Sequence, residues 1–369
     1  MELFCTRPGC PEPVNPCPDF ENPRILRTTR DRLCACCGMP LILGDRYLPI
    51  QWLGQGGFGA AFLARDRHTP GMRPCVLKQF KPAQQLTHDQ HQLAHELFMR
   101  EGEVLEELGR EHLQIPDLFA FFDLEVPGLQ PETDEGYFYL VQEFIDGQNL
   151  EQELLARGRF EEPEVLEVLT SMVGVLGFVH AHHTIHRDIK LSNIMRNTRG
   201  RLFLLDFGAI KFATSQSQGT AWGTPIFSPG YAPPEQVIGA NVSFSSDFYA
   251  LAASCVELLT GLAPQQLRHP VNHRWAWRSQ VAITPAFAEI LDRMLQPDPI
   301  DRFQTAAEIL AALRSADLLS PESLAGEGRS DFQPPLFSDR PSRMQQDFQA
   351  NSRIRQPIET QMPLDYSAD

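Results

Sequence analysis

The stretch from His186 to Gly208 constrains this chain more strongly than any other part of its sequence. It begins with His186-Arg187-Asp188-Ile189-Lys190-Leu191-Ser192-Asn193, passes through a short apolar segment at 202–205 and ends with Asp206-Phe207-Gly208. If 202–205 is a strand, two acidic residues, a lysine and an asparagine reach one place from two loops. Such a set can hold a divalent metal ion beside a hydroxyl group that must lose its proton. Phosphoryl transfer requires this arrangement, because its transition state needs positioning and charge neutralisation more than covalent chemistry.

The pattern H-R-D-x-K-x-x-N followed by D-F-G resembles the catalytic and metal-binding loops of eukaryotic-type serine/threonine protein kinases. The resemblance covers roughly residues 47–313. It implies an α+β, bilobal protein-kinase fold, with an N-lobe at 45–144 that holds a small antiparallel sheet and one long helix, and a mainly helical C-lobe at 145–314. The implied activity is transfer of the γ-phosphate of ATP to Ser and Thr hydroxyls of proteins, with autophosphorylation, in bacterial signalling.

The resemblance assigns a role to each polar residue of the two loops. Asp188 orients the substrate hydroxyl and accepts its proton, and Lys190 lies near the transferred phosphoryl group. Asn193 and Asp206 bind Mg²⁺ or Mn²⁺. Leu191 stands where the family commonly has proline, a departure that removes no chemistry.

A glycine-rich segment lies between two apolar runs near the start of the kinase-like region. It contains G-x-G-x-x-G, with glycines at Gly54, Gly56, Gly57 and Gly59. A Rossmann dinucleotide site is the rival interpretation, but it requires a helix directly after the third glycine of that motif. Here a strand, a turn and a second strand ending at Lys78 fit better. The glycines then form a hairpin turn whose backbone amides cover the ATP phosphates.

Lys78 ends an apolar strand, where an unpaired ammonium group is costly to bury. The segment Gln90–Leu108 has helical spacing and offers several glutamates as partners. By resemblance to the family, Glu101 in Arg100-Glu101-Gly102-Glu103 is the partner, and Glu96 is the second candidate. Lys78 and Glu101 would together hold the α- and β-phosphates.

The resemblance also places the adenine ring. Gln142 is the gatekeeper, and Glu143-Phe144-Ile145 is the hinge whose backbone binds adenine. The apolar walls of this slot would be Leu53, Ala61, Val76, Met195 and Leu205. Ordinary core packing would account for the same residues, and a ligand pocket is itself mostly apolar wall.

A Ser/Thr/Gly-rich stretch after Gly208 resembles the activation segment. It ends in Pro233-Pro234-Glu235, where the family usually has Ala-Pro-Glu, and Arg302 is the expected partner of Glu235. Arg187 is expected to pair with a phosphorylated residue of the segment. The candidate acceptors are Ser215, Ser217, Thr220 and Thr224, whereas Ser228 is expected at a structural position beside the substrate.

Residues 1–44 are rich in Cys and Pro and show little helical or strand periodicity. Cys5 and Cys10 are five residues apart, and Cys34 and Cys37 form a C-x-x-C pair. Two such pairs suit tetrahedral zinc in a zinc-ribbon-like segment, so these four cysteines are the favoured ligands. Cys17 and Cys36 are spare, so the set is not unique. Free thiols, or a reversible disulfide at Cys36 or Cys37, are the alternatives. The four cysteines together with Cys75-Val76-Leu77-Lys78 resemble a four-cysteine subgroup of bacterial kinases found in cyanobacteria.

The net charge of -15 argues against nucleic acid and anionic membranes as partners. No signal peptide is visible, and the apolar run 165–179 is interrupted by polar residues and indicates a core helix, so we expect a cytoplasmic protein.

Residues 315–369 have the composition of a disordered tail. The sequence leaves the oligomeric state open. The alternatives to an active kinase are a pseudokinase scaffold and a binding module regulated by zinc or redox state.

Overall fold

The computed structural model describes residues 1–319 apart from 56–58, 81–87, 130–133, 208–210, 213–227 and 270–273. The side chains of 88–94 and 211–212 are also outside this description. Residues 320–369 of the predicted tail, the tip of the glycine-rich turn and the proposed phosphate acceptors before Ser228 therefore lie outside the described residues.

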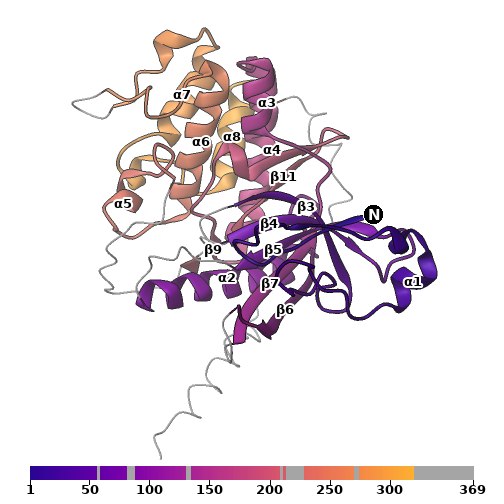
Figure 1. Cartoon of the computed structure of the whole chain (residues 1–369). Helices are drawn as coiled ribbons and strands as arrows, with labels where there is room; N and C mark the ends of the chain where they lie inside the picture. The colour runs from indigo at the N-terminus through magenta and orange to yellow at the C-terminus, as the bar shows by residue number, and fades with distance from the viewer. Residues whose placement is uncertain are drawn as a thin grey trace, which may run out of the picture. The chain divides into compact units, whose positions relative to one another are not determined.

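A five-stranded antiparallel sheet forms the N-lobe, in the order β3-β4-β5-β7-β6 (Figure 1). Its strands are β3 (Tyr47–Gln55), β4 (Gly59–Asp66), β5 (Arg73–Phe80), β6 (Leu118–Pro127) and β7 (Asp134–Glu143). The Pro, Glu and Gly residues of 125–136 predict a loop between two strands, and this prediction was wrong at both ends. Pro127 pairs with Asp134, so the two strands continue close to their turn.

Successive side chains of β5 point to opposite faces of the sheet, as in any strand. Lys78 faces the same side as α2 (His88–Leu108), the long helix of the lobe. Phe98 of α2 packs into the core cluster that also contains Leu140 of β7. A Cβ at Gly102 would lie 2.7 Å from the Phe121 ring, so glycine allows α2 to approach β6 closely.

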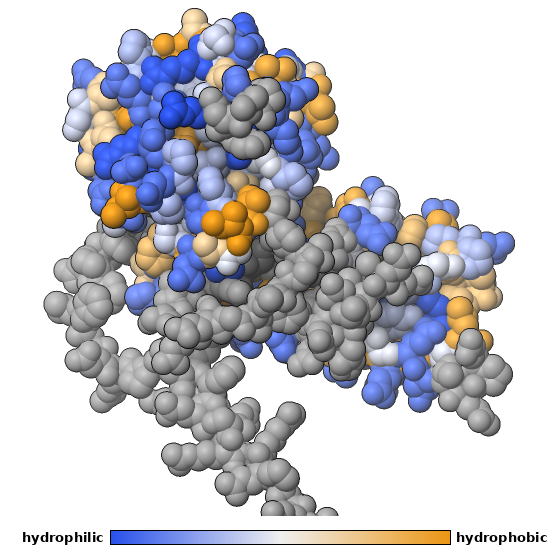
Figure 2. All heavy atoms as spheres, turned by 90° about the vertical axis from the view of Figure 1, so that its left-hand side faces the viewer, coloured by the Kyte–Doolittle hydropathy of each residue, from blue (hydrophilic) through white to orange (hydrophobic). Residues whose placement is uncertain are grey.

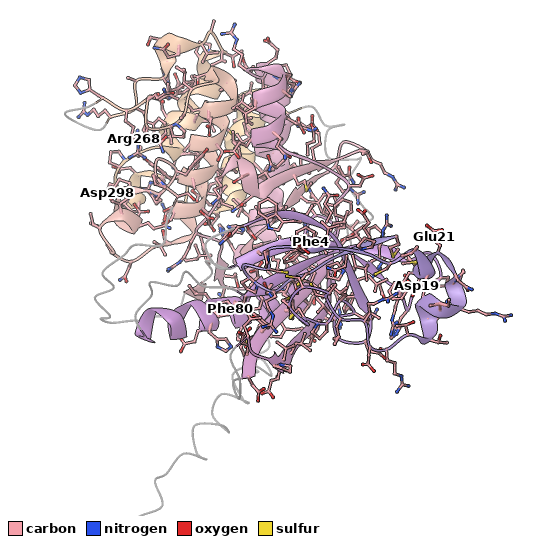
Figure 3. The ribbon with its side chains drawn as sticks, viewed as in Figure 1. Phe4, Asp19, Glu21, Phe80, Arg268 and Asp298 are labelled. Atoms are coloured by element: carbon pink, nitrogen blue, oxygen red, sulfur yellow. The ribbon has the colours of Figure 1, made fainter. Side chains whose placement is uncertain are left out.

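The opposite face of the sheet is covered by residues 1–44, which we call the leader. The leader contains β1 (Glu2–Phe4), β2 (Val14–Pro16), a 3-10 turn η1 (Pro18–Glu21) and α1 (Pro23–Thr28). The leader therefore contains short regular elements although its sequence shows little helical or strand periodicity. Phe4 lies over the sheet (Figure 3), with its ring centroid 5.8 Å from that of Phe62.

The leader and the sheet share one hydrophobic core. Leu3, Met39 and Leu43 of the leader are at most 1% exposed. They belong to the same buried cluster as Leu77 of β5 and Val141 of β7. This shared core explains why a segment without clear periodicity folds into short, well-packed elements: its apolar residues are ordered by the sheet below them.

The C-lobe is mainly helical (Figure 1). Its helices are α3 (Leu150–Arg157), α4 (Glu162–Ala181), α5 (Pro234–Val237), α6 (Phe244–Thr260), α7 (Pro285–Met294) and α8 (Ala306–Ser315). Short 3-10 turns are η2 (Leu191–Asn193), η4 (Arg278–Gln280) and η5 (Pro299–Asp301). Two small antiparallel sheets complete it, formed by β8 (Gly147–Asn149), β10 (Ile194–Asn197) and β11 (Leu202–Leu204), and by β9 (Thr184–Ile185) and β12 (Lys211–Phe212).

Two helices form the centre of the C-lobe. By resemblance to the kinase family, 244–260 is expected to be the central buried helix of the C-lobe. This segment is α6, and it is buried along almost its whole length. Of the described helices, α4 alone is long and apolar enough to cross a membrane by length and composition. Its apolar residues, Val168, Leu169 and Val173 among them, are buried in the core with α6, as predicted for a core helix. The described C-lobe surface in Figure 2 is mostly hydrophilic, with scattered apolar residues.

Candidate active site

The loop that carries Asp188 is anchored to the first turn of α6 by one buried carboxylate. Asp247, which is fully buried, accepts hydrogen bonds from the backbone N–H groups of His186 at 2.9 Å and Arg187 at 2.8 Å. Its Oδ2 atom also lies 2.8 Å from Nε2 of His180. Arg187 has a φ of 69°, a conformation that is strained for a residue with a side chain. The bonds to Asp247 stabilise this bend and fix the direction of Asp188.

Asp188 is surrounded by donors. Lys190 Nζ donates to Asp188 Oδ2 at 2.8 Å, and Asn193 Nδ2 donates to the same oxygen at 3.1 Å. Ser228 Oγ donates to Asp188 Oδ1 at 2.6 Å and accepts from Lys190 Nζ at 2.9 Å. The structure thus brings together Asp188, Lys190 and Asn193, and it shows an aliphatic hydroxyl already bound to the Asp188 carboxylate.

Asp206 enters the site because the next residue is locked into the core. Phe207 is fully buried, and its ring meets the His186 ring edge-on at 4.9 Å. His186 Nε2 lies 3.0 Å from the carbonyl oxygen of Leu205. Asp206 itself has a φ of 64°. This bend turns the carboxylate away from the buried Phe207 and towards Lys78.

Lys78 connects the two lobes. Its Nζ atom lies 2.5 Å from Oε1 of Glu101 on α2 and 2.5 Å from Oδ1 of Asp206. Of the two glutamates that the sequence offered, Glu101 is therefore the one in contact with Lys78. Burial disfavours the ammonium, but Asp206 and Glu101 outweigh it and raise the Lys78 pKa. The positive charge of Lys78 in turn lowers the pKa of Asp206.

The predicted nucleotide-binding residues lie around this lysine on adjoining strands. Ala61 of β4 pairs with Lys78 of β5 and with Gly54 of β3. Val76 is two residues before Lys78 on the same strand, and Gly59 begins β4. Leu53 is 42% exposed near the end of β3. Gly56 and Gly57 lie outside the described residues.

The expected hinge follows β7. The N–H of Glu143 donates to the carbonyl oxygen of Asp117 at 2.9 Å, which ties the end of β7 to the start of β6. Burial raises the pKa of the Glu143 carboxyl. Ile145 is buried, and Met195 lies on β10, paired with Asn149 of β8. Glu143, Ile145 and Met195 are thus held in place by backbone pairing and burial.

A second ion pair holds the end of the activation segment. Arg302 Nη1 and Nη2 donate to Glu235 Oε1 and Oε2 at 2.7 and 2.9 Å, a bidentate geometry. Ser246 Oγ also donates to Glu235 Oε1 at 2.7 Å. The predicted Glu235–Arg302 pair is confirmed, and the proline at 233 does not prevent it.

Arg187 is half-buried beside Asp247. Burial lowers the pKa of its guanidinium to about 10. Its Nε atom has no hydrogen-bond partner among the described residues. The predicted phosphate acceptors for Arg187 fall within 213–227, so that pairing stays a prediction.

The leader brings four thiols to one point. The Sγ atoms of Cys5, Cys10, Cys34 and Cys37 all lie within 4.8 Å of one another. The Cys5–Cys37 and Cys10–Cys34 sulfur distances are 3.5 and 3.8 Å, and all eight cysteines of the chain are free. Tetrahedral zinc with Zn–S bonds of about 2.3 Å needs sulfurs roughly 3.8 Å apart. The donor set therefore fits zinc.

The environment of Cys34 favours a thiolate. Burial opposes its charge, but the backbone N–H groups of Cys36 and Cys37 and the Asn15 side chain stabilise it, and its pKa falls to about 7. Burial raises the pKa of Cys10 to about 12. Of the two spare cysteines, Cys17 is buried and Cys36 is exposed.

A family model for the protein kinase domain matches residues 47–313. The chain belongs to the protein kinase family. Serine/threonine-protein kinase F of Synechocystis sp. is 50% identical over 315 residues, which are 85% of this chain and 63% of that protein. Serine/threonine-protein kinase PknA of Nostoc sp. is 40% identical over 287 residues, 75% of this chain and 48% of that protein. The chain thus spans about half to just under two thirds of the length of these two kinases.

The kinase site offers suitable ligands for magnesium. Mg²⁺ prefers oxygen ligands and keeps several of its waters, so one or two protein groups suffice. Asp206 supplies a carboxylate that is 52% exposed. Asn193 uses its Nδ2 group to bind Asp188, which leaves the amide oxygen as its metal-binding atom.

The sequence did not identify Asp247 as the anchor of the catalytic loop. The available signal was a single carboxylate in the first turn of an otherwise apolar helix. Nor did it reveal the hydrogen bond between the Thr6 and Tyr139 hydroxyl groups, because nothing in their local sequence distinguishes these two residues from ordinary core residues. Ser228 lies beside Asp188, as expected.

Proposed function

We propose that this chain is an ATP-dependent serine/threonine protein kinase that transfers the γ-phosphoryl group of ATP to protein hydroxyls. The carrying observation is the arrangement around Asp188, where a serine hydroxyl donates to the carboxylate and also accepts from Lys190. A substrate Ser or Thr presents the same group. The names of the two cyanobacterial relatives, both serine/threonine-protein kinases, support the same reaction.

Each residue of the site then has a chemical role. Asp188 accepts a hydrogen bond from the substrate hydroxyl and takes its proton as the oxygen attacks the γ-phosphorus. The bond between that phosphorus and the bridging oxygen breaks, and ADP leaves. Lys190 donates to the phosphoryl oxygens on which negative charge develops. A carboxylate oxygen accepts two hydrogen bonds, so Asp188 Oδ1 can bind a substrate hydroxyl beside Ser228.

Lys78 serves the nucleotide side of the reaction. It is held between Glu101 and Asp206, and an ammonium at this point can donate to the α- and β-phosphates. Asn193 and Asp206 are the residues that would hold Mg²⁺, whose charge offsets that of the phosphates. The glycine-rich hairpin between β3 and β4 would cover the triphosphate, and the hinge at Glu143 and Ile145 would bind adenine.

The test is phosphate transfer from ATP to a generic basic protein in the presence of magnesium. Asp188→Asn keeps the shape of the side chain but removes the proton acceptor, so we expect transfer to fall by at least about 100-fold. Asp123→Asn, which changes an exposed carboxylate on β6, is the matched control and keeps full activity. Equal activity of the Asp188 and Asp123 variants contradicts the proposed role, and nucleotide binding without transfer by the unmodified chain indicates a pseudokinase.

We also propose that Cys5, Cys10, Cys34 and Cys37 hold a structural zinc ion. Their sulfur distances support this, and so does the burial of Cys5 and Cys34. Metal analysis of the reduced protein should find one zinc per chain, which Cys37→Ser removes and Cys36→Ser retains. No metal in the reduced protein contradicts the proposal. A site of four thiolates also suits the reducing cytoplasm, where we place the protein.

A further inference from the structure

Three consecutive leader residues connect the four-thiol cluster to the N-lobe sheet. Cys5 belongs to the cluster. Thr6 Oγ1 lies 2.8 Å from the hydroxyl oxygen of Tyr139 on β7. Arg7 donates from Nη2 to the carbonyl oxygen of Pro127 at 2.7 Å, and its Nη1 lies 3.1 Å from Glu135. A group that fixes Cys5 therefore also fixes where Thr6 and Arg7 meet the strands.

The contact of Thr6 continues to the strand that carries the ATP-site lysine. Gln79 Nε2 donates to the Tyr139 hydroxyl oxygen at 2.8 Å, and Gln79 follows Lys78 directly. Thr6, Gln79 and Tyr139 are 2%, 1% and 0% exposed. Water cannot easily replace these hydrogen bonds, so losing one leaves a buried polar group without its partner.

The leader also reaches the base of the glycine-rich hairpin. Leader residues including Phe4, Thr6 and Arg7 line one side of a pocket whose other side contains Gln55 and Ala60. Gln55 ends β3 and Ala60 is the second residue of β4, so they flank the turn that should cover the phosphates. The leader thus lies beside both parts of the proposed nucleotide site that the sheet carries.

We propose that the leader positions the ATP-binding strands of this kinase, with Tyr139 as the residue that transmits the position of the thiol cluster to Lys78. The inference rests on the proposed kinase function and deepens it. Lys78 projects from one face of β5, and the hydrogen bonds of Gln79 and Tyr139 hold the other face. Tyr139 touches neither substrate nor nucleotide, so it is a positioning residue and its effect should appear in ATP binding.

The decisive variant is Tyr139→Phe, which removes the hydroxyl and keeps the ring. Tyr47→Phe is its matched control, because Tyr47 is equally buried in the same core but its hydroxyl has no hydrogen-bond partner among the described residues. We expect Tyr139→Phe to raise KM for ATP and Kd for a fluorescent ATP analogue roughly fivefold, the factor for one typical hydrogen bond. KM for the protein substrate should stay unchanged, and Tyr47→Phe should change neither constant.

Thr6 provides a second pair of variants. Thr6→Val is nearly isosteric and lacks the hydroxyl, whereas Thr6→Ser keeps it. Thr6→Val should weaken nucleotide binding like Tyr139→Phe, and Thr6→Ser should behave like the unmodified kinase. The double variant Thr6→Val/Tyr139→Phe should bind nucleotide no more weakly than either single variant, because both substitutions remove the same hydrogen-bonded connection.

Metal removal provides the third arm, with hydrogen exchange as a readout that needs no turnover. Treating the full chain with a zinc chelator should weaken nucleotide binding and speed amide exchange in β5, with little further effect in Tyr139→Phe. Equal nucleotide affinity of Tyr139→Phe, Tyr47→Phe and the unmodified chain overturns the inference, as does an equal rise in KM for both substrates. If the unmodified chain binds ATP but transfers no phosphate, the proposed kinase function fails, and the binding and exchange measurements still decide this inference.

Discussion

Two of the ion-pair clusters among the described residues, Arg302–Glu235 and Lys78–Glu101–Asp206, differ in their exposure to solvent. In the C-lobe, Arg302 is 0% exposed and Glu235 is 8% exposed, and both oxygens of the carboxylate are bound. Between the lobes, Lys78 is 18% exposed and one of its two partners, Asp206, is 52% exposed. The first cluster is closed to solvent, and the second opens onto it.

This difference suits the closed pair to a structural role and the open cluster to the proposed reactive site. A buried pair gives up hydration permanently, and breaking it leaves a charge without a partner. A pair that stays partly hydrated can exchange a partner, which the proposed binding of phosphates by Lys78 requires. Arg302 also suits its role because its planar group matches a carboxylate with two bonds, whereas Lys78 is a compact charge that can turn between Glu101, Asp206 and a ligand.

The largest expected effect is on the closed pair. Arg302→Met should lower the free energy of unfolding by about 3–5 kcal/mol, because Glu235 is left buried without its cation. Urea unfolding followed by fluorescence measures this. The double variant Glu235→Gln/Arg302→Met should recover part of the loss, since no unpaired charge remains. If the double variant is less stable than Arg302→Met, the loss does not come from an unpaired buried charge on Glu235.

The open cluster should show the reverse pattern. Lys78→Met should reduce phosphate transfer by about 100- to 1,000-fold, the typical cost of removing one donor from a charged transition state. Its unfolding free energy should change by less than about 1 kcal/mol, because Asp206 is half-exposed. Burial also raises the pKa of Glu101, so that group can take up a proton when its cation is removed. If Lys78→Met keeps its activity and loses stability, the cluster serves folding and not phosphate transfer.

The smallest effect concerns Glu257 of α6, a carboxylate that faces a hydroxyl. Tyr231 donates its hydroxyl hydrogen to Glu257 Oε2, and burial raises the pKa of Glu257 to about 7 from an ordinary value of 4.5. The folded protein therefore holds a proton at a pH where the unfolded chain has lost it. The contribution of Glu257 to the free energy of unfolding is therefore fullest below pH 4.5 and is lost as the pH rises through 7.

Glu257→Gln keeps an acceptor for Tyr231 and removes this titration. Its melting temperature should exceed that of the unmodified chain by at most a few degrees at pH 8 and should match it at pH 4.5. Calorimetry at the two pH values measures the difference. A gain of the same size at both pH values would assign the effect to packing instead of charge.

The parts of the fold that sequence reasoning predicted are those where chemistry or periodicity is local. The residues around Asp188 and Asp206 are close in sequence and have fixed spacing, so the motifs alone suffice to propose their roles. The helix at 244–260 was expected from the resemblance to the family, and α6 has these bounds, ending before Gly261, which adopts a φ of 69°. Arg302 was predicted as the partner of Glu235 from the resemblance, although the two lie far apart in sequence.

The parts that were missed depend on contacts distant in sequence. Nothing near Thr6 indicates Tyr139, and the leader's elements are too short to produce a period. One signal was present in β5, where Cys75, Val76 and Leu77 are consecutive apolar residues. A strand that is apolar on both faces has both faces covered. That pattern indicates a cover over the outer face of the sheet, and the leader is that cover.

The cover has a consequence for how this protein can be divided. The region that matches the protein kinase domain begins at Tyr47, but Phe62, Leu77, Tyr139 and Val141 are buried together with leader residues that precede it. A fragment trimmed to the boundaries of the family would expose this apolar surface to water and invite aggregation. The smallest piece expected to behave as a well-folded kinase therefore starts at the first residues of the leader, so the unit that folds is longer than the unit that similarity defines.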